Sequence, residues 1–150
     1  DDLGVLVVAD ETTPLMSAPP TPEYAGYHML SAYDYIDRGS TDQTVGATTS
    51  TLFSFEIPEN TCWHFRYEAI GIPTTGTSGA SYSGEATVRR TTGAPVIIGS
   101  ASSGHVGEDA TSSAWSSAFS ISSNDLVVQV TGGASLTIDW SGCLMGRKSK

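Results

Sequence analysis

Residues 61–72 read TCWHFRYEAIGI. Large apolar side chains occupy every second position from Trp63 to Ala69, and polar or charged side chains occupy the positions between them. A β-strand turns successive side chains to opposite faces, so this alternation predicts a strand with one buried face and one polar face. A helix would place its apolar residues three and four apart, which this stretch does not do.

Shorter stretches of the same kind flank it on both sides. Strands are predicted at 51–57, 61–72, 82–91, 95–98, 114–121, 126–131 and 135–145. Turn residues separate several of them, at 58–60 and 123–125, and Gly132–Gly133 is typical of a tight hairpin. About seven short strands with regular turns predict an all-β fold, an antiparallel β-sandwich of jelly-roll-like type. Helix should be scarce.

The composition agrees with this class. The chain has 150 residues, the length of one domain, and only 15% of them are charged. Serine and threonine account for 39 residues and lysine for 2, which argues against a helix bundle. No apolar run approaches the ~20 residues that a membrane-spanning helix needs, and no signal-peptide pattern is present. We therefore expect no membrane partner.

The net charge is −9, and three of the seven basic residues fall in the last four positions. An acidic body repels phosphate backbones, so we expect no nucleic-acid partner. The chain starts at Asp1, ahead of which an initiator methionine is not normally removed. This start indicates either a processed precursor or a numbering that omits upstream residues.

Three parts are predicted: an N-terminal arm at 1–45, a β-sandwich domain at 46–146 and a basic tail at 147–150. The arm is acidic and proline-rich, with strands expected near 3–8 and 27–36. It should pack on the main body or on a neighbouring subunit, because it can bury little surface alone. Its aromatic residues are candidate interface residues: Tyr24, Tyr27, Tyr33 and Tyr35.

The two cysteines, Cys62 and Cys143, both fall on the polar faces of their strands. If those strands are neighbours, a cross-strand disulfide is geometrically feasible. The alternative is two reduced, half-buried thiols, which we favour because nothing else indicates secretion.

No catalytic site, metal site or cofactor is predicted. The three histidines lie in separate segments with no ligand at metal-binding spacing, and no G-x-S-x-G, Walker or dinucleotide motif occurs. The carboxylates Glu56, Glu68 and Glu85 fall at outward strand positions, where charge is the default. The tryptophans could stack on sugars, but their inward positions favour core packing.

From residue 53 to residue 146 the chain contains, in order, FSFEIPENTCWHFRYEAIG, YSGEATVRR, VIIGS, GEDATSSAWSSAFS and NDLVVQVTGGASLTIDW. This succession resembles the β-sandwich domains of tailed-bacteriophage structural proteins, in which an IP-x-N/G-T-x-W turn opens a strand and a segment of the type L-x-V-x-V-T-G…I-x-W ends the domain. The resemblance covers about two-thirds of the chain, consists of packing and turn residues, and departs from the usual pattern at Cys62. It implies a virion component that assembles in the host cytoplasm and is commonly a homotrimer.

Two functions follow from the resemblance. The first is a non-enzymatic capsid decoration (cement) protein, whose arm would grip the major capsid protein, another virion protein or sister subunits. The second is a tail-fibre or receptor-binding tip that recognises host surface glycan through loops 73–81 and 100–113. Candidate receptor residues in or beside these loops are Tyr82, His105, Glu108 and Asp109. An enzyme, such as a glycan depolymerase, is the third and least favoured hypothesis, because no paired-carboxylate cleft is evident.

Overall fold

The computed structural model describes the backbone of residues 27–31 and 35–149, and the side chains of residues 38–149. Its strands are β1 (Tyr27–Ser31), β2 (Tyr35–Val45), β3 (Thr49–Glu56), β4 (Thr61–Pro73), β5 (Ala80–Arg90), β6 (Val96–Ile97), β7 (Ser102–Glu108), β8 (Ser116–Ser122), β9 (Asp125–Thr131) and β10 (Thr137–Lys148). Within these ranges the one helical element is a 3-10 turn, η3 (Ala110–Ser112), and no helix is long and apolar enough to span a membrane.

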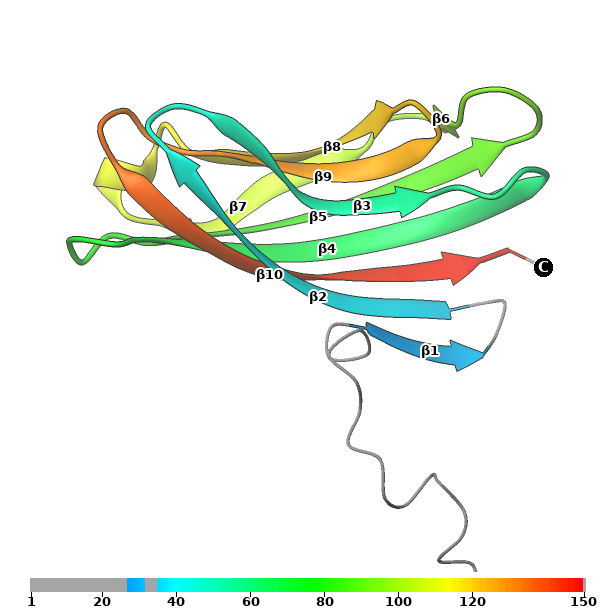
Figure 1. Cartoon of the computed structure of the whole chain (residues 1–150), viewed down its shortest axis with the longest axis horizontal. Helices are drawn as coiled ribbons and strands as arrows, with labels where there is room; N and C mark the ends of the chain where they lie inside the picture. Colours follow the sequence, from blue (N-terminus) through cyan, green and yellow to red (C-terminus); the bar gives the residue numbers. More distant parts are fainter. Residues whose placement is uncertain (1–26, 32–34, 150) are drawn as a thin grey trace, which may run out of the picture.

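The strands form two sheets that pack face to face (Figure 1). The large sheet has the order β1-β2-β10-β4-β5-β6, and β7 also pairs with β5; the small sheet has the order β3-β9-β8. Every pairing is antiparallel. The predicted all-β, antiparallel β-sandwich is confirmed, with two sheets of seven and three strands.

Two local predictions are wrong. Half of the polar loop expected at 100–113 is strand β7 (Ser102–Glu108), which pairs with β5 from Glu85 to Ala80. Gly132 and Gly133 form no hairpin, because β9 belongs to the small sheet and β10 to the large one. They lie where the chain crosses between sheets, and a Cβ on Gly132 would meet Thr44 Oγ1 at 2.4 Å.

The predicted division into arm, sandwich and tail stays a prediction. Strand β2, which lies within the expected arm, pairs along its whole length with β10. Strand β10 in turn extends into the expected tail, to Lys148. The strand expected at 3–8 lies outside the described residues.

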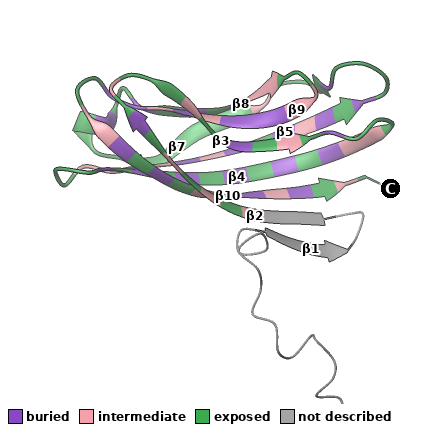
Figure 2. Ribbon diagram, viewed as in Figure 1, coloured by how far each residue is buried: buried purple, intermediate pink, exposed green. Residues whose placement is uncertain are grey.

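The core lies between the sheets and follows the alternation in the sequence. Along β4 the buried residues Trp63, Phe65 and Tyr67 alternate with exposed ones, which is visible as alternating bands in Figure 2. The facing β9 contributes Leu126, Val128 and Val130, all fully buried. The ladder between β3 and β9 shifts register between Thr51 and Phe53, so Leu52 is the extra residue of a bulge and both Leu52 and Phe53 reach the core.

Three core aromatics on the large sheet lie directly opposite a glycine of the neighbouring strand: Phe65 opposite Gly146, Tyr67 opposite Gly84, and Trp140 opposite Gly71. A Cβ on each glycine would come within 2.5 to 2.7 Å of the partner ring. Each ring therefore lies across the backbone of the next strand, in space that the side chain of any residue other than glycine would fill.

Arg90 closes one end of the sandwich. Its side chain is 9% exposed and forms ion pairs with Glu59 at 3.2 Å and Glu56 at 3.8 Å. Its guanidinium also donates to the carbonyl oxygens of Ile57 at 2.8 Å and Gly93 at 2.7 Å. Because those carbonyls belong to the segments after β3 and β5, one side chain joins the two sheets.

We expect Gly84→Ala to destabilise the fold by ~1–3 kcal/mol, the usual cost of forcing extra volume into a packed core. Its Cβ would meet both the Tyr67 ring and the Ser102 carbonyl oxygen at 2.5 Å. Chemical denaturation measures the change. Gly104→Ala is the control, because a Cβ there meets nothing within 4 Å; equal stability of the two variants would contradict the packing argument.

Replacing Arg90 by methionine should lower the free energy of unfolding by about 2–3 kcal/mol, because a buried carbonyl loses a charged donor. Arg89→Met is the control, since Arg89 is the next residue and points to solvent. Thermal unfolding of both variants checks this. A loss of stability shared equally by the two would show that Arg90 does not hold the sheets together.

Candidate functional site

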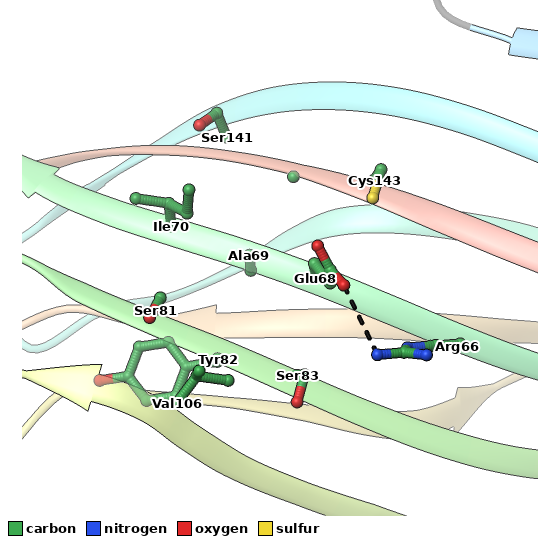
Figure 3. A pocket seen from close by; sticks show the side chains of 11 residues that line it. Arg66, Glu68, Ala69, Ile70, Ser81, Tyr82, Ser83, Val106, Ser141 and Cys143 are labelled. Carbon is green, nitrogen blue, oxygen red and sulfur yellow. Dashed lines mark ion pairs between the residues drawn. The ribbon is translucent and has the colours of Figure 1, made fainter.

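The outer face of the large sheet, away from the small sheet, carries a shallow groove. Three adjoining hollows form it, of about 600, 640 and 310 Å³. The first shares Ser141 with the second, and Arg66 and Ser83 with the third, so the three lie next to one another. We call this surface the outer groove; the side chains that line its centre are drawn in Figure 3: Arg66, Glu68, Ala69, Ile70, Ser81, Tyr82, Ser83, Val106, Ser141 and Cys143.

Strand register explains why these residues meet. One row crosses the sheet as Thr41, Ser141, Ile70, Ser81 and Gly107, each paired with the next. Residues paired in a ladder point to the same face of the sheet, so the alternation that buries the aromatics brings these small side chains together outside. Four of the five are small, which leaves the floor of the groove low.

Polar groups stand at both sides of this floor. Towards β2, Gln43 Nε2 donates to Asp139 Oδ1 at 2.7 Å. On the other side, further along β4, Arg66 Nη2 lies 3.7 Å from Glu68 Oε1, and both side chains are more than half exposed (Figure 3). These pairs contribute little to stability because water screens them, so their donors and acceptors are available to a ligand.

The groove also offers apolar surface. Ile70 is 49% exposed, Ile72 55% and Val106 72%. Ile70 and Ile72 lie two residues apart on β4 and therefore on the same face, between the two polar pairs. An apolar strip bounded by hydrogen-bonding groups is the general composition of a ligand-binding surface.

This site as a whole was not predicted from the sequence. Two of its lining residues, Tyr82 and His105, were candidate receptor residues, and Glu68 and Glu85 were interpreted as ordinary surface charge. Cys143 and Trp140 also line it, and neither was predicted to bind a ligand. A signal was present, because several outward positions of neighbouring strands are serine or glycine. This signal could be used only once the strand order was known. That order is not local, because β10, which separates β2 from β4, lies about ninety residues after β2 in the chain.

The candidate receptor residues lie at one end of the same sheet. Asp109 accepts a hydrogen bond from the amide of Gly79 at 2.8 Å, and its own amide donates to the carbonyl of Gly79 at 3.0 Å. Ser112 also donates to this carbonyl, at 3.2 Å. The two predicted receptor loops are therefore joined, and the Asp109 side chain has a structural partner.

His105 and Glu108 lie on strand β7, with His105 Nδ1 4.0 Å from Glu108 Oε2. Tyr82 is 4% exposed, and its ring lies 6.0 Å from that of Trp140. Its side chain is thus part of the core, and only its flank borders the outer groove. Within residues 38–149 every tryptophan, tyrosine and phenylalanine is buried or half-buried, so their interpretation as core residues agrees with the structure.

The two cysteines are not joined by a disulfide. Both are half-buried on the outer face of neighbouring strands, but Cys143 pairs with Glu68 rather than with Cys62. Six residues at ~3.3 Å per residue separate Glu68 from Cys62 along β4, or ~20 Å, far more than the ~4–7 Å between the Cα atoms of a disulfide. The structure therefore keeps the two thiols apart.

Of the four arm tyrosines, Tyr24 and Tyr33 lie outside the described residues, and Tyr27 and Tyr35 lie on β1 and β2 with side chains that are not described. Their interface role stays a prediction. In the described part of the chain, no group of three or more histidine, cysteine, aspartate or glutamate residues could hold a metal ion.

Within residues 38–149, three buried hydroxyls have no hydrogen-bond partner: those of Tyr67, Tyr82 and Ser117. Burial, helped by the nearby Glu108 carboxylate and by Tyr67, raises the pKa of Tyr82 to about 12. Burial also raises the pKa of Tyr67, and the neighbouring Ser117 hydroxyl opposes this rise. Both phenols are therefore neutral in the folded protein well above the pH at which an exposed tyrosine ionises.

No protein-family model matches the chain, and no curated protein matches its sequence. Solved structures similar to it include the tailspike protein of Acinetobacter baumannii phage AM24 (TM-score 0.46, 8% identity, covering 76% of this chain and 27% of that one). Another is a tailspike protein from Acinetobacter baumannii bacteriophage Fri1, described as a capsular polysaccharide depolymerase (TM-score 0.44, 10% identity, covering 92% and 23%). The chain thus spans about a quarter of the length of these proteins.

Both neighbours are described as phage tailspike proteins, and one of them bears on a sequence-based prediction. The prediction of a non-enzymatic protein is contradicted, because the Fri1 protein is described as a depolymerase, and we withdraw it.

Stability should fall as the pH rises from 10 towards 12. The unfolded chain loses the Tyr82 proton near pH 10 whereas the folded chain keeps it to about 12, so the tyrosine's stabilising effect is complete below pH 10 and is lost through this window. Denaturation at stepped pH measures this loss. Tyr82→Phe should be at least as stable as the unmodified chain at neutral pH and should lose less stability above pH 10; an unchanged alkaline profile would contradict this account.

Proposed function

We propose that this chain is a glycan-binding module of a bacteriophage tail component, and that the outer groove is its binding surface. The proposed ligand is a polysaccharide of the bacterial surface. The observation that supports this most is the extent of the groove across five strands, from β2 to β7, over a floor of small side chains.

The chemistry of the groove suits sugars. A sugar ring presents hydroxyl groups at its rim and apolar C–H groups on its faces. Serine hydroxyls, the Gln43–Asp139 pair and the Arg66–Glu68 pair supply donors and acceptors for the rim. Ile70 and Ile72 supply apolar contact for a face.

The similar tailspikes suggest which glycan to try first, since one is described as acting on capsular polysaccharide. Their likeness describes a fold, and the proposal stands on the groove itself. Capsid decoration is the competing hypothesis, and it requires a surface that binds a capsid protein. Self-association as a homotrimer and location in the virion are further proposals, which the resemblance of residues 53–146 supports.

The direct test is binding of the full chain to a panel of purified bacterial capsular polysaccharides that includes those of Acinetobacter baumannii. Ser81→Trp fills the floor of the groove and should weaken binding at least tenfold, about 1.4 kcal/mol. Thr87→Trp is the matched control, because Thr87 lies on the same face of β5, is equally half-buried and does not line the groove. Thermal unfolding confirms that both variants are folded.

The two thiols report where the ligand lies. Bound polysaccharide should protect Cys143, which lines the groove, from an alkylating reagent, and should leave Cys62 reactive. Absence of binding across the panel would overturn the proposed function. Binding that Ser81→Trp leaves unchanged, or that protects Cys62 instead, would overturn the assignment to the outer groove.

A further inference from the structure

We infer that the outer groove holds an internal stretch of a polysaccharide lying across the strands, and not a single terminal sugar. This inference rests on the proposed function and specifies the form of its ligand. Three features of the groove support it: its length, its open end at β7 and the order of its polar and apolar groups.

The length comes from the strands that contribute lining residues. These are β2, β10, β4, β5 and β7, in spatial order. Five neighbouring strands are separated by four spacings of ~4.8 Å each, so the groove is ~19 Å long in this direction. A disaccharide is shorter than that, and a short oligosaccharide would fill it.

The groove does not continue past its lining residues along the strands. His64 follows Arg66 on the outer face of β4, and Thr87 follows Glu85 on β5, but neither lines any of the three hollows. His64 Nδ1 and Thr87 Oγ1 lie 3.2 Å apart, so the two side chains bridge β4 and β5 just beyond the groove. The β2 end of the groove lies in the rows of Ile70 and Ile72, and its β7 end lies around the rows of Arg66 and Glu68, so a long ligand crosses the strands obliquely.

The β7 end is open. All seven residues of β7 are exposed, and Gly104, in the part that lines the groove, has no heavy atom within 4 Å of the position of a Cβ. Nothing among these residues closes over a chain that leaves the groove there. A site for a terminal sugar would instead enclose that sugar and use its end group for specificity.

Polar and apolar groups follow one another through the groove. The Gln43–Asp139 pair comes first, in the row of Ile72, then Ile72 and Ile70 on β4, and then the Glu68–Arg66 pair further along the same strand. Successive sugars of one chain would meet different partners, so each added sugar brings new contacts. Affinity should then increase with chain length until the groove is full.

The test uses fragments, sorted by length, from partial acid hydrolysis of the capsular polysaccharide that binds best. Affinity for the full chain is measured from the monosaccharide upward. We expect the affinity to rise at least tenfold from the disaccharide to the longer fragments and then to reach a plateau. A monosaccharide or disaccharide that binds as tightly as the polymer would overturn the inference and leave the proposed function standing. If the polymer itself does not bind, the proposed function fails.

Two variants test the direction. Gln43→Ala removes a contact at the β2 end. It should weaken the binding of long fragments about fivefold and leave the affinity for the disaccharide, which is held near Ile70, unchanged. His64→Ala is the control on the same face, and it should change neither, because His64 lies beyond the groove along β4. The proposed path would be overturned if Gln43→Ala lowered the affinity equally for fragments of every length. It would also be overturned if His64→Ala lowered the affinity for long fragments alone.

Discussion

The structure depends on a steric constraint between neighbouring strands: three large rings of the core lie flat across glycines of the next strand. Phe65, Tyr67 and Trp140 are each fully or almost fully buried, and each uses the space that a side chain on its glycine partner would fill. Packed interiors tolerate neither empty space nor overlap, so ring and glycine act as one unit. These units hold β10 against β4, and β4 against β5, in a single register.

The register set by the core determines the outer face as well. Because strand residues alternate between faces, fixing Tyr67 opposite Gly84 also places Glu68 opposite Ser83 and Ile70 opposite Ser81. A slip of one residue would exchange the two faces of the strand and destroy both core and groove. The groove is therefore assembled by packing on the opposite side of the sheet, and its rigidity is that of the core.

Periodicity alone was enough to locate most strands, because alternation at positions such as Trp63 to Ala69 is a local property. Pairing between distant strands was not predictable, since nothing in β2 indicates that β10, about ninety residues later, lies beside it. The same limit explains the error at Gly132–Gly133. Two glycines are typical of a hairpin, but here they lie where the chain crosses between the sheets and passes close to Thr44. Strand β7 was missed because SSGHVGE has no apolar face: all of its residues are exposed. The groove combines residues from five strands, so it was invisible until their order was known.

Strand β10 has a consequence for how the protein is made. It lies between β2 and β4 and pairs with both, yet it is the last strand of the described chain to be synthesised. Until it emerges from the ribosome, β2 and β4 each present an unpaired edge, and such edges invite pairing with other chains. Contacts between such distant segments also slow folding. A nascent chain therefore passes through a stage in which its large sheet is split in two, and its yield in the cell depends on how fast the final strand fills the gap.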